Sequence, residues 1–565
     1  MSQAADLRRA QPSPRVLAAL MLGVAVLFLT DLGGTDLWAP DEPRYAHVAD
    51  EVFSMRHGPG GLVLLHLNGE PYAQKPPLYY WLASLASLPG GEVTEWSARL
   101  PSALAGLAAV WLTFVLGRVM FDARTGAWAA ALLATVFDFA FMARHARLDV
   151  LLTLAVVAAL ACFWRLDGGR GSPRANVAGL HAAMGLGILV KGPVALLPLL
   201  AAAVYLAWER RLPELRRAVP PWAFALSALP GLAWVAAAVA LAPEGFFHEA
   251  VVMNTAGRFF TEYSKVEPWY FFIYQFPVNF LPWTLLWPLV FVEHRLRLRL
   301  PPEERENRAA WRFGLSWVAT WFVFFSLSTG KRDIYLMPCF PGAALLCAAA
   351  LESALARTGR LPAWVRGVAL GAIALVGGAG VAVAALGGRP LPREPEVAIP
   401  GLFGAALVAI AAAAALAWRA RPAPRERVAV LVATLAAAYL AVFALAFPAF
   451  EPSKSPRPIA AAAAAQTGPG EPIGLYRHEP MLGALAFYSK RRIVHMVTED
   501  DLRKFLAEGG RVVATRWSHI EALERVAEFQ VVSTFRSGRR SYLIAVARGA
   551  PAAAASATEA PRGAG

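Results

Sequence analysis

The stretch that decides the fold is "WAPDEPRYAHVADEVF", residues 38–53, which follows the first apolar run of the chain. Two neighbouring acids, Asp41 and Glu42, begin a segment in which Asp41, Arg44 and Tyr45 have the i, i+3, i+4 spacing of one helix face. Acids in a first turn can simply complement the helix dipole. Ionised groups close to a bilayer are costly, however, and usually have a function. The stretch therefore predicts a helix at a membrane surface that carries a functional carboxylate.

The composition places the chain among membrane proteins. Of its 565 residues 57% are hydrophobic and 17% charged, and the mean hydropathy is +0.45. The net charge of +14 comes from basic residues in short loops between apolar runs, which is the pattern of membrane topology and not of nucleic-acid binding. The three cysteines lie within apolar runs and predict no disulfide framework.

Thirteen apolar runs are candidates for membrane spans. They lie near 15–31, 99–118, 125–143, 149–165, 174–190, 193–208, 219–241, 271–292, 311–328, 335–356, 363–387, 399–418 and 427–448. Arg-rich segments occupy nearly every even-numbered turn, which predicts a cytoplasmic N-terminus and an outer C-terminus. The first run lacks a small-residue cleavage site and is expected to stay as a span.

Basic residues also occur in the loops that this topology places outside, where the positive-inside rule disfavours them. They are Arg44, Arg56, Lys75, Arg99, Arg144, Arg147, Lys191, Arg258, Lys265, Lys331 and Arg332, interleaved with Tyr45, Tyr72, Tyr79, Tyr80, Tyr263 and Tyr335. Each one could pair with a lipid phosphate, but the whole set suits an anionic head group held at the membrane surface.

Six motifs occur in an order that resembles one superfamily. They are "DEPRYA" (41–46), "PYAQKPPLYYW" (71–81), "RLPSAL" (99–104), "RHARLDVLLT" (144–153), "LVKGP" (189–193) and "GKRDIYLMPCFP" (330–341). The chain resembles the GT-C glycosyltransferases that use polyprenyl-phosphate sugars, of the protein O-mannosyltransferase and aminoarabinose transferase type. The resemblance implies an all-α polytopic membrane protein with about thirteen transmembrane helices and amphipathic juxtamembrane helices, plus a small C-terminal α/β domain in the periplasm.

The layout is most similar to the branch that transfers 4-amino-4-deoxy-L-arabinose from undecaprenyl phosphate to lipid A. The resemblance implies a bacterial inner-membrane enzyme whose partners are the lipid-linked sugar donor, lipid A or another periplasmic acceptor, and membrane lipids. Transfer of a hexose such as mannose to protein or another surface glycan is an alternative. A transporter for a lipid-linked sugar is another, but it should show internal symmetry between its halves, and the sequence has no such repeat.

The site residues follow from the same resemblance. Asp41 matches the catalytic aspartate, and Glu42 its acidic neighbour. Contacts to the carrier phosphate or sugar are implied for Arg44, Tyr45, Tyr72, Lys75, Arg258 and Tyr335, and Asp149 and Lys191 match recurring polar positions. The chain has Gln74 where a metal-binding Glu often stands, and "VVMNTAG" (251–257) has no histidine, so no metal ligand is assigned.

The chemistry can also be argued from the residues. A lipid phosphate is a good leaving group, so catalysis needs cations such as Lys75, Arg258 and either Lys331 or Arg332 to stabilise the departing charge. Asp41 would be a base for a hydroxyl acceptor, or would steer an acceptor that is already anionic. Attack from the side opposite the phosphate predicts inversion at the sugar carbon.

We expect four regions along the chain. They are a membrane catalytic domain over 1–450 with its first outer loop at 32–98, a Pro-rich linker over 451–470, an α/β domain over 471–548 with a largely parallel sheet, and a disordered tail over 549–565. His478, Glu479 and His495 are interpreted as loop and strand-end residues of the α/β domain, which has no nucleotide-binding motif.

Overall fold

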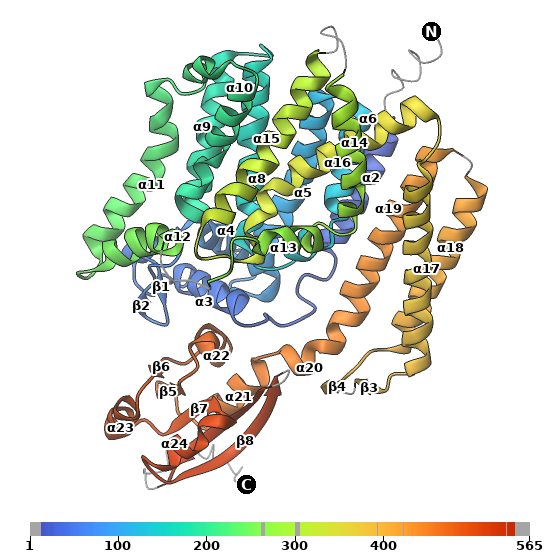
Figure 1. Ribbon diagram of the computed structural model, residues 1–565. Coiled ribbons are helices and arrows are strands. Elements are labelled where there is room, and N and C mark those ends of the chain that lie inside the picture. The colour runs from blue at the N-terminus through green and yellow to red at the C-terminus, as the bar shows by residue number, and fades with distance from the viewer. Residues whose placement is uncertain are drawn as a thin grey trace, which may run out of the picture.

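The computed structural model describes residues 13–260, 266–299, 305–391, 394–421, 423–537 and 540–548. It consists of a bundle of apolar helices and a small α/β domain at one end of that bundle (Figure 1). We call this the α3 end, because the helix predicted from residues 38–53 lies there as α3 (Asp41–Phe53). The predicted fold class, a polytopic helical membrane protein with a C-terminal α/β domain, is confirmed.

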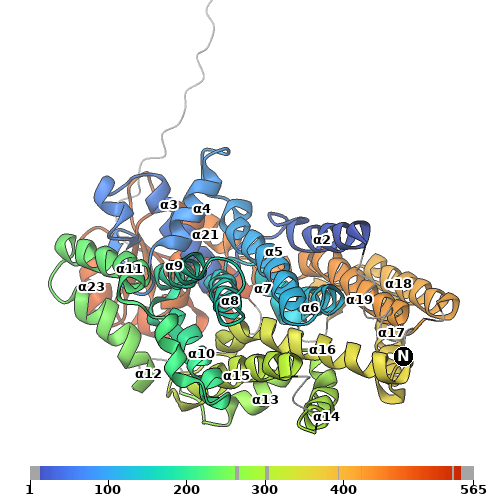
Figure 2. The ribbon, with the colours of Figure 1, turned by 90° about the horizontal axis from the view of Figure 1, so that it is seen from above.

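Apolar helices form most of the bundle. Their bounds are α2 (Pro14–Leu29), α5 (Glu95–Met120), α6 (Ala123–Ala134), α7 (Phe137–Ala143), α8 (Leu148–Asp167), α9 (Pro173–Lys191), α10 (Leu197–Trp208), α11 (Pro221–Leu241), α13 (Phe271–Asn279), α14 (Trp287–Arg297), α15 (Arg305–Leu327), α16 (Phe340–Thr358), α17 (Ala363–Leu386), α18 (Gly401–Ala420) and α19 (Pro424–Ala441). In the view from above, α17, α18 and α19 gather at one end of the bundle (Figure 2).

The predicted count of thirteen spans is not confirmed. Within the described ranges, eight helical stretches are long and apolar enough to cross a membrane, or up to ten if each of two bent pairs is one span. The bent pairs are α6 with α7, at 70°, and α13 with the segment from Trp283 to Arg297, at 104°. Two predicted spans are thus broken helices, which the hydropathy of the sequence does not reveal.

One of the eight stretches, Pro173–Trp208, passes along α8 twice. At the end of α9, Lys191 pairs with Asp149 in the first turn of α8. Near the end of α10, the Tyr205 hydroxyl donates to Asp167 at the other end of α8, at 3.0 Å. The chain therefore reverses in the short 3₁₀ helix η2 (Gly192–Leu196), where Gly192 has a φ of +78° that favours glycine. This reversal supports the two separate runs predicted on either side of "KGP".

The long loop between α2 and α5 contains η1 (Pro59–Leu62), the hairpin of β1 (His66–Leu67) and β2 (Glu70–Pro71), and α4 (Leu78–Ser87) in addition to α3. The sequence predicts an amphipathic α3 that lies along the membrane plane. Of its 13 residues, 11 are buried. The reason is that the C-terminal domain covers the side of α3 that faces away from the bundle (Figure 1).

The C-terminal domain has a five-stranded sheet in the order β6-β5-β7-β9-β8. Its strands are β5 (Ile473–Tyr476), β6 (Ile493–Met496), β7 (Val512–Arg516), β8 (Phe529–Ser537) and β9 (Arg540–Ala547). Strands β6, β5 and β7 are parallel, as predicted, but β9 runs antiparallel to both β7 and β8. Its helices are α21 (Arg457–Ala465), α22 (Leu482–Ser489), α23 (Glu499–Ala507) and α24 (Ile520–Glu524).

The stretch expected to be a linker is helical. It contains α20 (Glu451–Lys454) and α21, and Ile459, Ala460 and Ala463 of α21 pack in the same apolar cluster as Leu485 of α22. A second short hairpin, β3 (Pro390–Leu391) with β4 (Glu394–Ala398), joins α17 to α18 at the α3 end. The expected tail, 549–565, lies outside the described residues.

Polar contacts attach the C-terminal domain to the loop between α2 and α5. The Tyr488 hydroxyl accepts from the backbone N–H of Leu37 at 2.7 Å and donates to Glu95 at 3.0 Å. The side-chain amide of Asn68 donates to the carbonyl oxygen of Ile493 at 2.5 Å and accepts from its N–H at 2.8 Å. These contacts connect residues about 400 positions apart, so the loop and the domain form one structural unit.

Candidate active site

Three guanidinium groups surround the Asp41 carboxylate. Arg44, one helical turn along α3, pairs with Oδ1, and Nη1 of Arg147 donates to Oδ2 at 2.5 Å. Arg332, just before the 3₁₀ helix η7 (Asp333–Cys339), lies 3.7 Å from Oδ2. Asp41 is only 6% exposed. Three segments that are distant in the sequence thus bring their cations to one carboxylate.

The position of each group has a local cause. Pro40 precedes the first turn of α3, so Asp41 and Arg44 share a face at i, i+3. Arg147 is the extended residue before α8, and Ser102 of α5 holds its backbone: the Ser102 hydroxyl donates to the Arg147 carbonyl and accepts from its N–H, both at 3.0 Å. The side chain of Arg147 therefore leaves a fixed backbone and reaches Asp41.

The electrostatics keep Asp41 ionised. Burial alone would raise the pKa of Asp41, but the charges of Arg147, Arg44 and Arg332 outweigh burial and hold the pKa below its usual value. A carboxylate with a lowered pKa is a weak base. It is well suited to attract or orient a positively charged centre.

Glu42 faces a different environment. Its two oxygens accept from Nε and Nη2 of Arg99, each at 3.0 Å, and from the backbone N–H groups of Trp38 at 3.1 Å and Ala146 at 2.8 Å. Glu42 is buried, at 1% exposure. Burial raises the pKa of Glu42, but the charge and hydrogen bonds of Arg99 lower it by more. The pKa of Glu42 therefore lies well below its usual range. Glu42 is therefore an internal tie between α3, α5 and the turn before α8.

Four tyrosines form the wall next to Arg44. The ring of Tyr45 lies 5.9 Å from that of Tyr79 and 6.0 Å from that of Tyr80, and Tyr80 donates to the Tyr72 hydroxyl at 3.5 Å. The Arg44 guanidinium lies 5.5 Å from the Tyr45 ring centre. The predicted residues Arg44, Tyr45 and Tyr72 are thus brought together.

A second group of predicted residues adjoins the first. Lys191 pairs with Asp149, and its ammonium lies 4.7 Å from the centre of the Tyr335 ring. Asp149, in the first turn of α8, comes two residues after Arg147, and Tyr335 comes three residues after Arg332. These two segments therefore connect the Asp149–Lys191–Tyr335 group with the arginines around Asp41.

Of the two neighbours Lys331 and Arg332, only Arg332 reaches Asp41. Lys331 is 2% exposed, and its ammonium donates to the backbone carbonyls of Ser328 and Glu267, the latter at 2.9 Å. Burial lowers the pKa of Lys331. Its contacts hold together the turn before η7, whereas the Arg332 side chain remains 47% exposed.

The remaining predicted phosphate ligands lie on two adjoining segments. Lys75 is half-buried in the segment between β2 and α4. Arg258 begins α12 (Arg258–Phe260), and its side chain lies outside the described residues. The segment before it, the π-helix η4 (His248–Gly257), contacts the Lys75 segment through Asn254, whose side-chain amide donates to the Ala73 carbonyl at 3.2 Å.

Arg147 was not among the site residues chosen from the sequence. The signal that could have found it is its place in "RHARLDVLLT", a loop where the positive-inside rule disfavours arginine. That rule also marked Arg144 and Arg99, however, which donate to carbonyl oxygens inside the fold. The sequence alone could not separate these roles.

The groups around Asp41 do not fit a divalent cation, because its neighbours are guanidiniums that would repel one. Within the described ranges, no three or more His, Cys, Asp or Glu side chains gather in a way that could hold a metal ion. In the α/β domain, His478 hydrogen-bonds to the Tyr542 hydroxyl at 3.1 Å.

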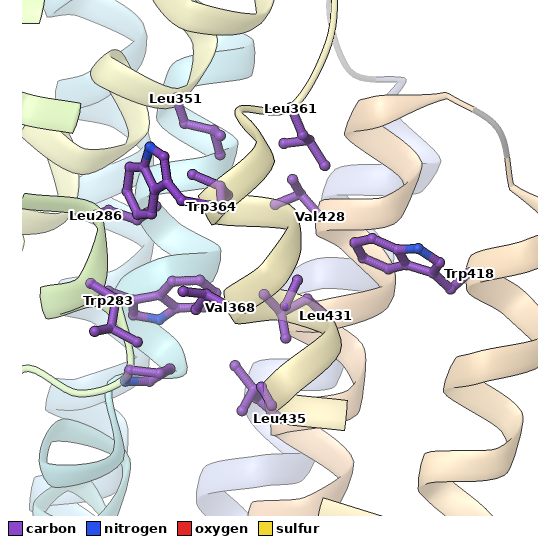
Figure 3. Close-up of a pocket in the computed structure, with 15 residues that line it drawn as sticks. Trp283, Leu286, Leu351, Leu361, Trp364, Val368, Trp418, Val428, Leu431 and Leu435 are labelled. Atoms are coloured by element: carbon purple, nitrogen blue, oxygen red, sulfur yellow. The ribbon is translucent and has the colours of Figure 1, made fainter. Parts of the chain in front are cut away.

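A hollow among the apolar helices has a different character. Side chains of α16, α17, α18 and α19, with Trp283 and Leu286, line a space of about 30 Å³ (Figure 3). No charged residue is among them. An apolar space of this size cannot bind a phosphate.

Known proteins share the fold of this chain and part of its sequence. Residues 15–254 match the family model of dolichyl-phosphate-mannose-protein mannosyltransferase. The structure of ArnT from Cupriavidus metallidurans bound to undecaprenyl phosphate shares the fold, with a TM-score of 0.74 at 22% identity over 94% of this chain and 98% of that one. The archaeal oligosaccharyltransferase AglB from Archaeoglobus fulgidus is similar at a TM-score of 0.52 and 13% identity, over 90% and 69% of the two chains.

Curated relatives match part of the sequence. The undecaprenyl phosphate-α-4-amino-4-deoxy-L-arabinose arabinosyl transferase 1 of Pseudomonas fluorescens is 34% identical over 343 residues, 58% of this chain and 56% of the relative. The corresponding transferase of Pseudomonas aeruginosa is 33% identical over 353 residues, 60% and 59% of the two chains. The match thus spans somewhat more than half of their length. The resemblance drawn from the six motifs is confirmed.

Proposed function

We propose that this protein is an integral-membrane glycosyltransferase that moves 4-amino-4-deoxy-L-arabinose from undecaprenyl phosphate to lipid A. The observation that carries the proposal is the Asp41 carboxylate held among Arg44, Arg147 and Arg332. Support for the donor and the sugar comes from the names of the curated relatives and from the ArnT fold.

In this proposal the Asp41 carboxylate occupies, before the donor binds, the position that the donor phosphate takes later. Three guanidiniums around one carboxylate also form a site for a phosphate, which arginine binds through paired hydrogen bonds. When the donor arrives, its phosphate takes over one or more of these arginines. The carboxylate is then released toward the sugar and the acceptor.

The transfer step follows from this exchange. The bond between the anomeric carbon and the phosphate oxygen breaks, and the phosphate leaves with the electron pair, stabilised by the arginines and by Lys75 and Arg258. An acceptor oxygen forms the new bond from the opposite side, so the configuration inverts. A hydroxyl acceptor would pass its proton to Asp41, whereas an anionic phosphate acceptor has none to pass. The lowered pKa of Asp41 favours the anionic acceptor, with Asp41 stabilising positive charge on the sugar.

The other residues have supporting roles. Tyr45 and Tyr72, beside Arg44, would contact the sugar or the phosphate, and the Asp149–Lys191–Tyr335 group would support the segments that carry Arg147 and Arg332. Lys331 fixes the turn that presents Arg332. Glu42 positions α3 through Arg99 and does not touch the substrates.

We further propose that the protein lies in the bacterial inner membrane with its N-terminus in the cytoplasm and its active site and C-terminal domain in the periplasm. The Arg-rich turns of the sequence support this orientation. Single cysteines at the exposed positions Arg56 and Arg360, in a background without cysteines, should react with impermeant reagents from the periplasmic and the cytoplasmic side respectively. The reverse pattern would contradict the orientation.

Transfer of mannose to protein is the second candidate, favoured by the description of the matching family model. Purified protein in vesicles should be given undecaprenyl phosphate carrying aminoarabinose or mannose, with lipid A or a peptide as acceptor. We expect product from the aminoarabinose donor and lipid A, and none from the Asp41→Asn variant. Mannosylated peptide as the main product would establish the second candidate instead.

A further inference from the structure

A cavity of about 600 Å³ lies between the bundle and the C-terminal domain. Trp38, Ala39 and Pro40, just before α3, form one side, and residues 452–459 form another. The third side consists of His478 and the strands β8 and β9. A cavity of this size suits a ligand the size of one or two sugar rings.

The lining has a marked chemical bias. Its cations are Lys454 near the end of α20, Arg536 of β8 and Arg540 of β9, while Glu396 is the one acid among the described residues that line it. Aromatic side chains, Trp38, Phe535 and Tyr542, line it too. Cations with flat apolar surfaces form the combination that recognises a sugar with anionic substituents.

The side of the cavity formed by the C-terminal domain is held by a hydrogen bond within that domain. His478 is 4% exposed, and its Nε2 hydrogen-bonds to the Tyr542 hydroxyl at 3.1 Å. Burial, and after it the charges of Arg516 and Arg540, lower the pKa of His478 to about 4. The imidazole is therefore neutral at pH 7. The positive charges of the neighbouring arginines that lower its pKa would also attract an anion.

The cavity adjoins the candidate active site without sharing its arginines. Pro40 lines the cavity and is bonded directly to Asp41, whose Cα is therefore about 3.8 Å from that of Pro40 or closer. The lining does not include Arg44, Arg147 or Arg332, which surround Asp41. Two ligands could therefore approach the first turn of α3 separately.

We propose that this cavity binds the anionic, phosphate-bearing sugar head group of the acceptor, with Arg540, Arg536 and Lys454 facing its charges and Trp38 facing its ring. The proposal rests on the proposed function and names where the acceptor binds. Donor phosphate and acceptor head group then occupy different cation sets, and both reach Asp41.

The test compares acceptor kinetics of Arg540→Ala and Arg540→Glu with those of Arg503→Ala. Arg503 is an exposed arginine of α23 in the same domain and does not line the cavity. We expect the KM for lipid A to rise about 10- to 100-fold in the Arg540 variants, because charge-assisted contacts are lost. The kcat and the affinity for undecaprenyl phosphate should stay as in the wild type, and Arg503→Ala should match the wild type.

Lipid A with its phosphates removed enzymatically supplies the second arm, as a competitor for binding and not as an acceptor, because the favoured acceptor group is itself a phosphate. If the cavity binds anionic groups, intact lipid A should compete for the wild type much better than the dephosphorylated form does, and the Arg540 variants should lose this difference. An unchanged KM for intact lipid A, or the same difference in the Arg540 variants, would overturn the inference.

A third measurement separates this inference from the proposed function. If the wild type transfers no sugar, the proposed function fails. Binding of intact and dephosphorylated lipid A can then be compared by native mass spectrometry of the full chain. Preferential binding of intact lipid A that the Arg540 variants lose would still support an acceptor-type anionic site, and equal binding would reject it.

Discussion

Gly483 of α22 lies directly against the backbone of Arg44 in α3. A Cβ at position 483 would sit 2.5 Å from the Arg44 Cα and 2.8 Å from its Cβ, closer than atoms can approach. Only glycine allows this contact. The C-terminal domain therefore touches α3 at the residue that holds Asp41, on the opposite side from the bundle.

The Gly483→Ala variant should disturb the active site from a distance. Since backbone atoms cannot move aside as a flexible side chain can, α3 and α22 must separate, and Arg44 must shift relative to Arg147. We expect kcat to fall roughly 10- to 100-fold, as for small misplacements of reacting groups. Gly367→Ala in α17, where an added Cβ meets nothing within 4 Å, is the matched control. Wild-type kcat in Gly483→Ala would show that the contact does not position α3.

Asp41 and Glu42 should fail in different ways. Asp41→Asn keeps the shape and removes the charge, so we expect transfer to fall by orders of magnitude, about 10²–10⁴-fold, while the protein stays folded. Glu42→Gln leaves the buried Arg99 without its counter-charge, and we expect a loss of about 3–5 kcal/mol of stability. Thermal unfolding in detergent, measured beside transfer per folded molecule, distinguishes the two. A stable, inactive Glu42→Gln would instead indicate a catalytic Glu42.

The pH dependence of transfer should report the arginines around Asp41. Because the folded pKa of Asp41 is lowered, its carboxylate form persists as the pH falls and is lost only below the usual aspartate range. Removing the Arg147 charge with Arg147→Gln leaves burial less opposed and raises this pKa. The acid limb of the kcat/KM profile should therefore move to higher pH in the variant. An acid limb in the same place would mean that another group titrates.

Lys331 and Arg332 are neighbours with opposite expected phenotypes. Lys331→Met removes the donor for two backbone carbonyls in a buried turn and should reduce the yield and thermal stability of the protein. Arg332→Met removes a half-exposed cation near Asp41 and should weaken binding of undecaprenyl phosphate in a folded protein. Vesicle binding assays and size-exclusion chromatography separate the two. If Lys331→Met stayed folded and lost donor binding while Arg332→Met kept it, Lys331 would be the donor ligand and not Arg332.

Local sequence patterns could predict α3 but not its surroundings. The spacing of Asp41, Arg44 and Tyr45 and the preceding Pro40 fixed the helix and its functional face, because these depend on residues four positions apart at most. The pairing of Asp41 with Arg147 joins positions 106 apart, and no periodicity encodes such a contact. For the same reason the sequence could not predict that α22 would bury the far side of α3.

The choice between Lys331 and Arg332 was also beyond the sequence. Adjacent residues in a turn point in different directions, and only the turn before η7 determines which of the two faces Asp41. The breaks within two of the predicted spans were hidden because hydropathy measures composition and not direction. The sequence allowed the chemistry of the site to be inferred, a carboxylate with cations and tyrosines. It did not show which of the individual cations contact the carboxylate.

The paired hydrogen bonds between Asn68 and Ile493 have a consequence for the C-terminal domain as a unit. β6 is an edge strand, and an edge strand offers unpaired backbone groups to any passing chain. The Asn68 amide mimics a neighbouring peptide group there and occupies the donor and the acceptor of Ile493. The membrane-anchored loop thus shields the sheet against addition of a foreign strand, and the C-terminal domain cut free of the bundle would expose a self-association surface that the intact chain keeps covered.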